Sequence, residues 1–536
     1  MATLFYNVRA YLGPSSFARA VLVDGETICA VGSDALSMVP PGAERVDGQG
    51  ASLVPGFCDS HLHLKGWGAR LHRINVYGVK SIDELVEKAR SELERLNPPG
   101  GTLVFGSGWN QEEFTGMAEK DRRYPDRHDL DRVSLDHGIV LNRICGHTAC
   151  CNTFALKLAG ISASGLPQKG RVDLDKSGGP SGVFHGKAID TLRNLTVPYT
   201  DAQNREQLSS ALAYAASQGL SSAISQDVYD NNYRPVLDAY RQVLDKTPLR
   251  VTLQCSYTGR RQLEEFARLG YVSGVNLGHP LLTMGGIKLY ADGSLGSRTA
   301  LLNEPYADAP LTRGLPAMSR EELSAAALYA DRLGFQVLIH AIGDAGAANA
   351  LTALEGLTVK GRNPRRHGII HVEVAGRDLL SRMAGQDILV LTQPAFLAHD
   401  VYILEERLGK ERAARALPLK SLYELGVRTS YGSDCPVESL NPLEGIQAAL
   451  LRQDISKAFP EGGFFPEEAV DLETALDAFT LGGAYAAGDE QRGRIQKGSR
   501  ADMVLLDRDI FSIPRNEIKN AKVLCTLVGG KTVYRV

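Results

Sequence analysis

The hydrophobic and polar positions along the chain define eight short apolar runs rich in β-branched residues, several of which end in a polar residue or a Gly-Asp turn. Such runs are typical of buried β-strands. Between most of them lie helix-like stretches with apolar residues at a spacing of 3.6, such as residues 321–330 after the N-cap candidate Ser319. The runs cover residues 52–57, 222–225, 250–254, 286–290, 336–340, 368–371, 388–392 and 427–431.

Alternating strands and helices predict parallel β/α units, and eight units predict an α/β protein with a closed (β/α)8 TIM-like barrel over residues 51–484. A doubly wound open sheet is the rival architecture. It requires a glycine-rich phosphate loop after the first strand, and residues 55–60, Pro-Gly-Phe-Cys-Asp-Ser, do not form one. We therefore expect the barrel.

The chain between the first two runs, about residues 66–200, is much longer than a βα loop needs. It contains helix-like residues 82–89 and strand-like residues 102–105 and 138–141. We predict a large insertion after strand 1 that roofs the active site at one mouth of the barrel.

The two ends of the chain, residues 1–50 and 485–536, consist of strand-and-turn sequence with Asp-Gly and Gly-Gly hairpin signals. Because a two-stranded piece is only marginally stable alone, we predict that both ends pair into one small β-sandwich domain.

Charge and composition exclude several classes of partner. The chain has 59 Lys and Arg against 62 Asp and Glu, a net charge of -3, and no long run of one sign that would mark a surface for nucleic acid. No signal peptide and no apolar stretch near the roughly 20 residues of a membrane span are apparent. The 8 cysteines form no Cys-x-x-Cys pair. We expect a cytoplasmic protein that takes a small-molecule substrate and forms a homodimer, without a nucleic-acid or membrane partner.

Side chains that can bind metal or carry protons stand at the carboxyl ends of several runs. His61 and His63 follow the first run, and the strand period of two places both on one side, within reach of one metal ion. TIM-barrel enzymes place their active sites at this end of the strands. The other candidates are Lys288 in the fourth run, His340 and His371 at the ends of the fifth and sixth, and Asp434 after the eighth.

Each candidate also has an ordinary structural interpretation. A lone His-x-His pair or strand-end histidine is more often a satisfied core or rim residue. Lys288 could lay its stem along apolar surface, and Asp434 could cap a helix or form a turn. Four imidazoles, one carboxylate and one lysine at the same end of several strands favour a metal centre instead.

Several segments carry a family resemblance. Residues 54–63, Val-Pro-Gly-Phe-Cys-Asp-Ser-His-Leu-His, are similar to the signature of the amidohydrolase superfamily of metal-dependent hydrolases, and residues 493–504 resemble its C-terminal signature. Residues 288–300, 340–344 and 432–437 resemble the amidohydrolase-3, YtcJ-like subgroup. The resemblance runs nearly end to end.

This resemblance implies a barrel beside a small β-sandwich, with one or two divalent ions, most often zinc. Addition of CO2 to the neutral amine of Lys288 would give a carbamate that can bridge two ions, and Asp434 would deprotonate the water activated by the metal and return the proton to the leaving nitrogen. The implied ligands are His61 and His63 for the buried ion, carboxylated Lys288 as the bridge, His340 and His371 for the outer ion, and Asp434 as ligand and general base.

Two positions depart from the subgroup. Residues 368–371 read Gly-Ile-Ile-His where Arg-Ile-Glu-His is frequent, so an acidic neighbour of His371 is missing and Glu373 is a candidate replacement. Cys435 stands where a small alanine is common. Because a free buried cysteine usually fills space, we expect it to pack rather than react.

Four residues are candidates for substrate binding. By resemblance, residues 106–110 and 145–152 of the insertion roof the pocket, with Trp109 and His147 facing substrate; alternatively, Trp109 belongs to the core of the insertion and His147 to a hydrogen-bonded turn. Asp292 and Arg298 either pair with each other or contact a substrate carboxylate.

The leading functional hypothesis is a metal-dependent hydrolase of a non-peptide C–N bond in an amide, an N-acyl or N-formyl amine, or a cyclic imide. A deaminase of an amino-substituted heterocycle and an esterase or lactonase are alternatives, although superfamily deaminases usually lack a carboxylated lysine, so Lys288 weighs against deamination. A non-catalytic ligand-binding or regulatory relative is a third hypothesis. The complete ligand set with a water-activating base counts against it.

Overall fold

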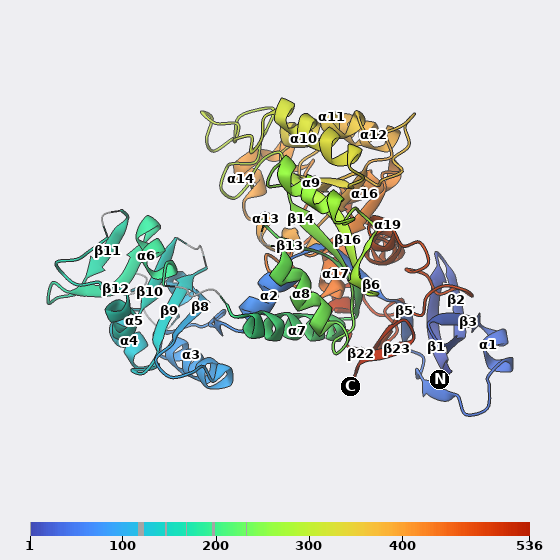
Figure 1. Ribbon diagram of the computed structural model, residues 1–536, viewed down its shortest axis with the longest axis horizontal. Coiled ribbons are helices and arrows are strands. Elements are labelled where there is room, and N and C mark those ends of the chain that lie inside the picture. The colour runs from blue at the N-terminus through green and yellow to red at the C-terminus, as the bar shows by residue number, and fades with distance from the viewer. Residues whose placement is uncertain (1, 116–122, 145–146, 168, 196–198, 232) are drawn as a thin grey trace. The chain divides into compact units, whose positions relative to one another are not determined.

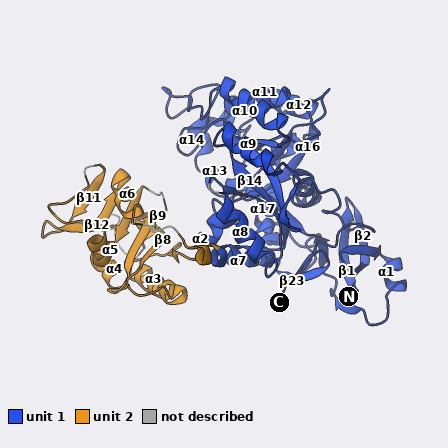
Figure 2. Ribbon diagram, in the orientation of Figure 1, with its two compact units in different colours: residues 1–68, 205–536 blue, residues 69–204 orange. Residues whose placement is uncertain are grey.

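The computed structural model spans residues 1–536 and describes all of them except 1, 116–122, 145–146, 168, 196–198 and 232. Figure 2 shows its two compact units: residues 1–68 with 205–536, and residues 69–204. No helix of the described residues is long and apolar enough to cross a bilayer.

The larger unit contains the predicted barrel of eight parallel strands (Figure 1). The end of its first strand meets the chain that follows its last strand, because the Asp434 amide donates to the His61 carbonyl over 2.7 Å and the His63 amide to the Cys435 carbonyl over 2.8 Å. Each of the eight predicted runs overlaps a barrel strand, the first of them only at Phe57. In spatial order the barrel strands are β6 (Phe57–Leu62), β13 (Leu220–Val228), β14 (Arg250–Ser256), β16 (Leu282–Tyr290), β17 (Val337–Ala341), β18 (Gly368–His371), β19 (Leu389–Thr392) and β20 (Thr429–Tyr431).

Helices follow the barrel strands as the sequence predicts. The capping box at Ser319 is present, since its hydroxyl accepts from the Glu322 amide over 3.2 Å while the Glu322 carboxylate accepts from the Ser319 amide over 2.9 Å. The main helices that lie wholly or mostly in this unit are α7 (Asp201–Ser217), α8 (Arg234–Val243), α9 (Arg260–Arg268), α10 (Arg320–Arg332), α11 (Asp344–Glu355), α12 (Arg377–Gly385), α16 (Leu419–Glu424) and α17 (Pro442–Leu451). Shorter ones are α2 (Leu64–Leu71), α13 (Leu397–Asp400), α14 (Leu404–Leu408), α15 (Lys410–Ala413), α18 (Leu472–Asp477) and α19 (Gly483–Ala486).

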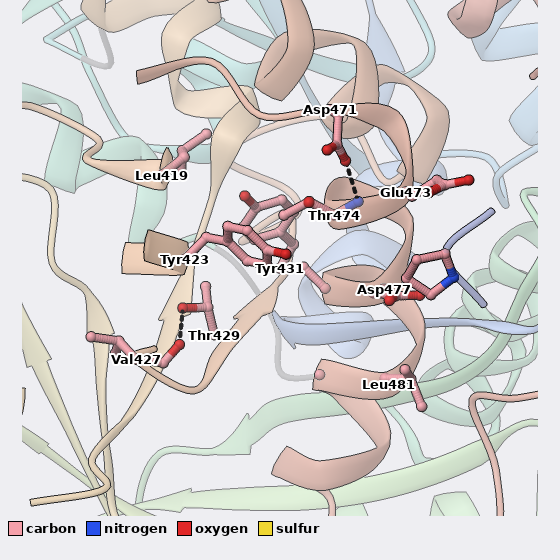
Figure 3. Close-up of a pocket in the computed structure, with 13 residues that line it drawn as sticks. Leu419, Tyr423, Val427, Thr429, Tyr431, Asp471, Glu473, Thr474, Asp477 and Leu481 are labelled. Carbon is pink, nitrogen blue, oxygen red and sulfur yellow. Dashed lines mark hydrogen bonds between the residues drawn. The ribbon is translucent and has the colours of Figure 1, made fainter. Parts of the chain in front are cut away.

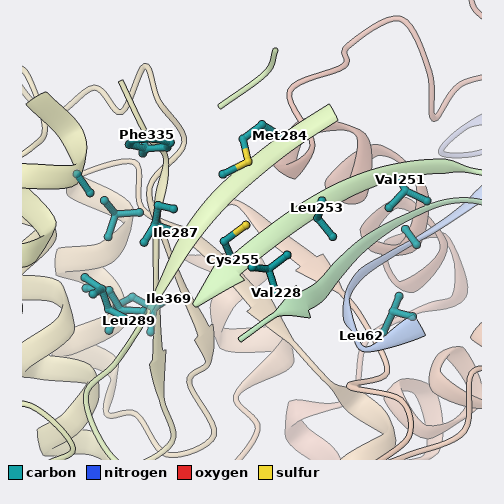
Figure 4. Close-up of a cluster of buried hydrophobic side chains, with 14 of the residues drawn as sticks. Leu62, Val228, Val251, Leu253, Cys255, Met284, Ile287, Leu289, Phe335 and Ile369 are labelled. Atoms are coloured by element: carbon teal, nitrogen blue, oxygen red, sulfur yellow. The ribbon is translucent and has the colours of Figure 1, made fainter. Parts of the chain in front are cut away.

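The main core lies between the strands and these helices (Figure 4). On β14, Val251, Leu253 and Cys255 pack into this core. On β16, Ile287 and Leu289 do the same. Because side chains alternate along a strand, Lys288 between them faces the barrel interior. The alternation that builds the core therefore also positions the lysine.

Strands from both chain ends form one sheet, the terminal sheet, as the sequence predicts. The grouping of residues 1–50 and 485–536 into a separate β-sandwich domain stays a prediction. Val504 near the C-terminus pairs with Val54 near the N-terminus. Along the sheet the order is β23 (Lys531–Arg535), β22 (Val523–Val528), β21 (Met503–Leu506), β5 (Ser52–Pro55), β1 (Thr3–Gly13), β2 (Ser16–Asp24) and β3 (Thr27–Val31), with β4 (Glu44–Asp47) paired to β1 and α1 (Ser33–Ser37) following β3.

One predicted strand proves to be two. The first run, residues 52–57, divides at Gly56 into β5 of the terminal sheet and the start of barrel strand β6. A side chain at Gly56 would lie 2.3 Å from the Ser221 hydroxyl, and the Gly56 amide donates to the Asp502 carbonyl over 2.8 Å. The close approach of β13 at this point requires glycine.

Asp502 ties the terminal sheet to the barrel, and its loss is expected to destabilise the larger unit. Its carboxylate is 1% exposed and accepts from the Arg250 guanidinium over 2.8 Å and from the Gly529 amide over 2.6 Å. Asp502→Ala leaves both donors buried without their acceptor, so we expect a loss of about 3–5 kcal/mol. Urea denaturation measures it. Glu490→Ala, which removes an exposed partner of Arg366, is the control and should change stability by less than about 0.5 kcal/mol.

The smaller unit, residues 69–204, has its own six-stranded sheet and core. Predicted residues 82–89 and 138–141 lie in α3 (Ile82–Leu96) and β9 (Gly138–Arg143), and predicted residues 102–105 begin one position before β8 (Leu103–Trp109). The placement of the insertion over the active site stays a prediction. The sheet order is β11 (Arg171–Leu174), β12 (Pro180–His185), β10 (Thr148–Cys151), β9 (Gly138–Arg143), β8 (Leu103–Trp109) and β7 (Ile74–Asn75), and the helices are α3 (Ile82–Leu96), α4 (Arg127–Asp131), α5 (Thr153–Leu158) and α6 (Ile189–Arg193).

Candidate metal centre

The six candidate ligands stand on five barrel strands or directly after them, at the carboxyl ends. Four of them are buried: His61 is 0% exposed, Lys288 and His371 are each 3%, and Asp434 is 8%. The side chains of His63 and His340 are 18% and 14% exposed. The structure therefore brings all six to one end of the barrel, as strand alternation predicts.

Three of them form a compact donor set. Nε2 of His63 lies 2.9 Å and Nε2 of His61 lies 3.5 Å from Oδ1 of Asp434. One ligand atom from each residue falls within 4.8 Å of the others. Electron-rich atoms this close are held together by a proton or a metal cation. Nζ of Lys288 lies 2.8 Å from Nε2 of His61, at the edge of this set.

Hydrogen bonds orient the first two imidazoles. Nδ1 of His63 lies 2.9 Å from the Gln226 carbonyl oxygen, which can only accept, so Nδ1 carries the hydrogen. Nδ1 of His61 lies 3.2 Å from Oε1 of Gln254. In both rings the second nitrogen, Nε2, faces Asp434. This pattern, with one nitrogen fixed by a neighbour and the other directed inward, is typical of metal-binding histidines.

His340 and His371 complete the centre on the neighbouring strands. Their ring centroids are 4.6 Å apart, and the His371 ring lies 5.7 Å from that of His61. Nδ1 of His371 is 2.8 Å from Oε1 of Gln393, which leaves its Nε2 as the ligand atom. Nε2 of His340 is instead 3.1 Å from the Gly293 carbonyl, so His340 offers Nδ1.

Burial sets the protonation states of the centre. It lowers the pKa of His61 and of His371 well below the usual value, so both are neutral at pH 7. It lowers the pKa of Lys288 to about 8, against the opposing effect of Asp434. Burial raises the pKa of Asp434, but its contact with His63 and nearby positive charge outweigh this and hold that pKa below its usual value. Neutral imidazoles and an ionised carboxylate are the states that bind divalent cations.

Asp59 organises the centre and was not singled out by the sequence. It is 1% exposed, and its carboxylate accepts from the Ser433 hydroxyl over 2.5 Å and from the His61 amide over 3.1 Å. It therefore ties the chain that carries Asp434 to the strand that carries His61. Its position two residues before His61 on the same strand is the signal that could have indicated it.

Asp292 and Arg298 do not pair with each other. Asp292 is 3% exposed and accepts from the backbone amides of Leu301, Ile342 and Gly343 over 2.8–3.0 Å. Its Oδ1 also lies 3.6 Å from Nε2 of His340. Asp292 thus holds the loops beside His340, and its contact with substrate stays a prediction.

The Arg298 guanidinium pairs with Asp308 over 2.5 Å. Asp308 also binds the guanidinium of Arg407. Contact of Arg298 with substrate stays a prediction.

The two predicted substrate residues of the insertion occupy different environments. Trp109 is 0% exposed in the core of the smaller unit and donates its indole N–H to the Leu141 carbonyl over 2.9 Å, which favours the core interpretation over a substrate-facing one. His147 is exposed, and its carbonyl accepts from the Gly186 amide over 2.9 Å. Residues 145–146 of its motif lie outside the described residues.

Glu373 and Cys435 are both buried. Burial is the main cause that raises the pKa of Glu373 well above its usual value, and the charge of the neighbouring Asp400 raises it further. Glu373 therefore faces a second carboxyl group, and its role beside His371 stays a prediction. Cys435 belongs to the main hydrophobic core, consistent with packing.

A separate pocket of about 240 Å³ lies near the start of β20 (Figure 3). It is lined by residues of α16, α18 and β20 and by Pro14 from the terminal sheet. The Tyr11 hydroxyl donates to Asp477 over 3.0 Å and the Ser15 amide to Glu473 over 3.0 Å, so terminal sheet and barrel join here. None of the candidate ligands lines this pocket. It belongs to a structural junction, away from the ligand-bearing strand ends.

Comparison with known proteins identifies the family. The model of the family described as "Amidohydrolase family" matches residues 44–534. The chain belongs to the amidohydrolase family. This amidohydrolase is 34% identical to the putative amidohydrolase YtcJ of Bacillus subtilis, with 92% of this chain and 91% of the relative aligned. The predicted resemblance is confirmed.

Two further relatives extend the comparison. This amidohydrolase is 27% identical to the N-substituted formamide deformylase of Arthrobacter pascens over 98% of this chain and 97% of that protein. The crystal structure of an uncharacterized metal-dependent hydrolase from Pyrococcus furiosus is similar with a TM-score of 0.75 and 29% identity, covering 95% of this chain and 99% of that one. The fold is thus shared end to end.

Proposed function

We propose that this amidohydrolase is a metal-dependent hydrolase that cleaves a non-peptide C–N bond of a small molecule. The observation that carries the proposal is the convergence of His61, His63 and Asp434, whose ligand atoms lie within 4.8 Å of one another with both imidazoles oriented by hydrogen bonds. The name of the A. pascens relative supports an N-substituted formamide or a related amide as substrate.

The donor set fits zinc. Neutral imidazole nitrogen and carboxylate oxygen are its usual ligands, and a bound zinc ion supplies Lewis acidity. His61, His63 and Asp434 would hold one ion, and His340 and His371 a second. We propose that Lys288, buried and 2.8 Å from His61, is carboxylated and bridges the two.

Asp434 has the position and charge of the general base. Its carboxylate is ionised and nearly buried, with Oδ1 2.9 Å from Nε2 of His63, so it can accept a proton from the attacking water. The same carboxyl then returns the proton to the leaving nitrogen. Asp59, through Ser433 and His61, keeps Asp434 in place. We also propose a cytoplasmic location and a homodimer.

A substrate panel tests the reaction class. The zinc-loaded protein is incubated with N-substituted formamides, N-acyl amines, cyclic imides, amino-substituted heterocycles and aryl esters. We expect release of amine from the amides or imides, loss of that activity after chelation, and recovery with zinc. Release of ammonia from heterocycles alone, or hydrolysis of esters alone, would contradict cleavage of an amide-type bond. A preparation that binds no divalent ion would contradict the metal centre itself.

A further inference from the structure

Two oxygen atoms face the same ring nitrogen of His63. Nδ1 lies 2.9 Å from the Gln226 carbonyl oxygen and 2.5 Å from the hydroxyl oxygen of Tyr229. The carbonyl can only accept, so Nδ1 carries a hydrogen. The Tyr229 oxygen therefore accepts from the same N–H group. A hydroxyl that accepts in this way keeps its own hydrogen for a different acceptor.

Tyr229 lies where a substrate can reach it. It directly follows β13, at the carboxyl end where all the candidate ligands gather, and it is 52% exposed. Its ring is nearly parallel to that of His63, with an interplanar angle of 21° and centroids 6.0 Å apart. Tyr290, another tyrosine at this end, differs because its hydroxyl lies 3.4 Å from that of Ser256, where either oxygen can donate.

We propose that Tyr229 is a substrate-binding residue whose hydroxyl donates a hydrogen bond to an oxygen acceptor of the substrate. The proposal rests on the proposed function, because it takes Nε2 of His63 as a metal ligand. The hydroxyl is on the opposite side of the imidazole from Nε2, which faces Asp434 over 2.9 Å. The acceptor is therefore a carbonyl, amide or ether oxygen in the part of the substrate remote from the bond that is cleaved.

The test compares hydroxamates, which bind zinc directly. Zinc-loaded wild type and Tyr229→Phe are titrated calorimetrically with acetohydroxamic acid, which has no acceptor beyond its metal-binding group. They are also titrated with longer hydroxamates that carry an amide carbonyl at increasing distances. Tyr423→Phe, which alters an exposed tyrosine lining the pocket near the start of β20, is the matched control. Zinc content is measured for every protein.

We expect Tyr229→Phe to raise the Kd of at least one longer hydroxamate about fivefold to tenfold, which is the effect of one hydrogen bond. The Kd of acetohydroxamic acid should change less than about twofold. On a substrate found by the panel, KM should rise with kcat little changed. If the affinity for every hydroxamate fell equally, or if zinc were lost, Tyr229 would act only through His63 and the proposal would be overturned. So would no change for any hydroxamate. A wild type that binds no metal would instead overturn the proposed function.

Discussion

Asp434→Asn is expected to lower kcat by about 10²–10⁴-fold, the usual effect of removing a general base. Asparagine has nearly the same shape but cannot take a proton from water. It also removes the negative oxygen that lies 2.9 Å from His63 and 3.5 Å from His61, so metal affinity should fall as well. Turnover of the substrate identified by the panel and metal content per chain are the two measurements.

The control for this variant is Asp245→Asn, which changes a carboxylate whose side chain is 81% exposed. Its turnover and metal content should match those of the wild type. Asp434→Asn with full metal content and wild-type turnover would remove Asp434 from the reaction and contradict the proposed mechanism.

Lys288→Ala is expected to reduce the number of bound ions per chain and to lower turnover by at least about 100-fold. Lys288 is 3% exposed and its amine lies 2.8 Å from Nε2 of His61, so the variant removes the group proposed to bridge the two ions. Native mass spectrometry of the wild type should show the added mass of one CO2, which Lys288→Ala and Lys288→Arg should both lack.

Lys457→Ala, at a lysine whose side chain is 70% exposed, is the matched control and should keep the added mass and the activity. An unmodified Lys288 in a wild type with full metal content would contradict the carbamate bridge. It would leave a centre built from histidines and Asp434 alone, and the hydrolase proposal would still stand.

Strand periodicity predicted the barrel and the ligands because both depend on short-range pattern. The alternation on β16 places Lys288 inside the barrel for the same reason that it places Ile287 and Leu289 outside. The division of the first run at Gly56 was not predictable in this way. Leu53, Val54 and Phe57 on the two sides of Gly56 are all apolar and buried, so no local pattern marks the change from one sheet to the other.

Contacts between segments that are distant in the sequence were also not predictable from it. Asp59 and Ser433 are hydrogen-bonded although 374 positions separate them in the sequence. Gln393, which orients His371, directly follows the next barrel strand. Asp292 and Arg298 are near in sequence and opposite in charge, yet backbone amides and Asp308 satisfy them separately. Pairing of this kind depends on loop paths, which hydrophobic pattern does not determine.

The passage of one chain segment through two sheets has a consequence for biosynthesis. Strand β5 continues through Gly56 into the strand that carries His61, and its partner β21 lies near the other end of the chain. Contacts this far apart in sequence form slowly. The segment beside the ligands therefore lacks one neighbour until residues 503–506 have left the ribosome. We expect the nascent chain to acquire its metal only at this late stage, so fragments ending before β21 should emerge without it.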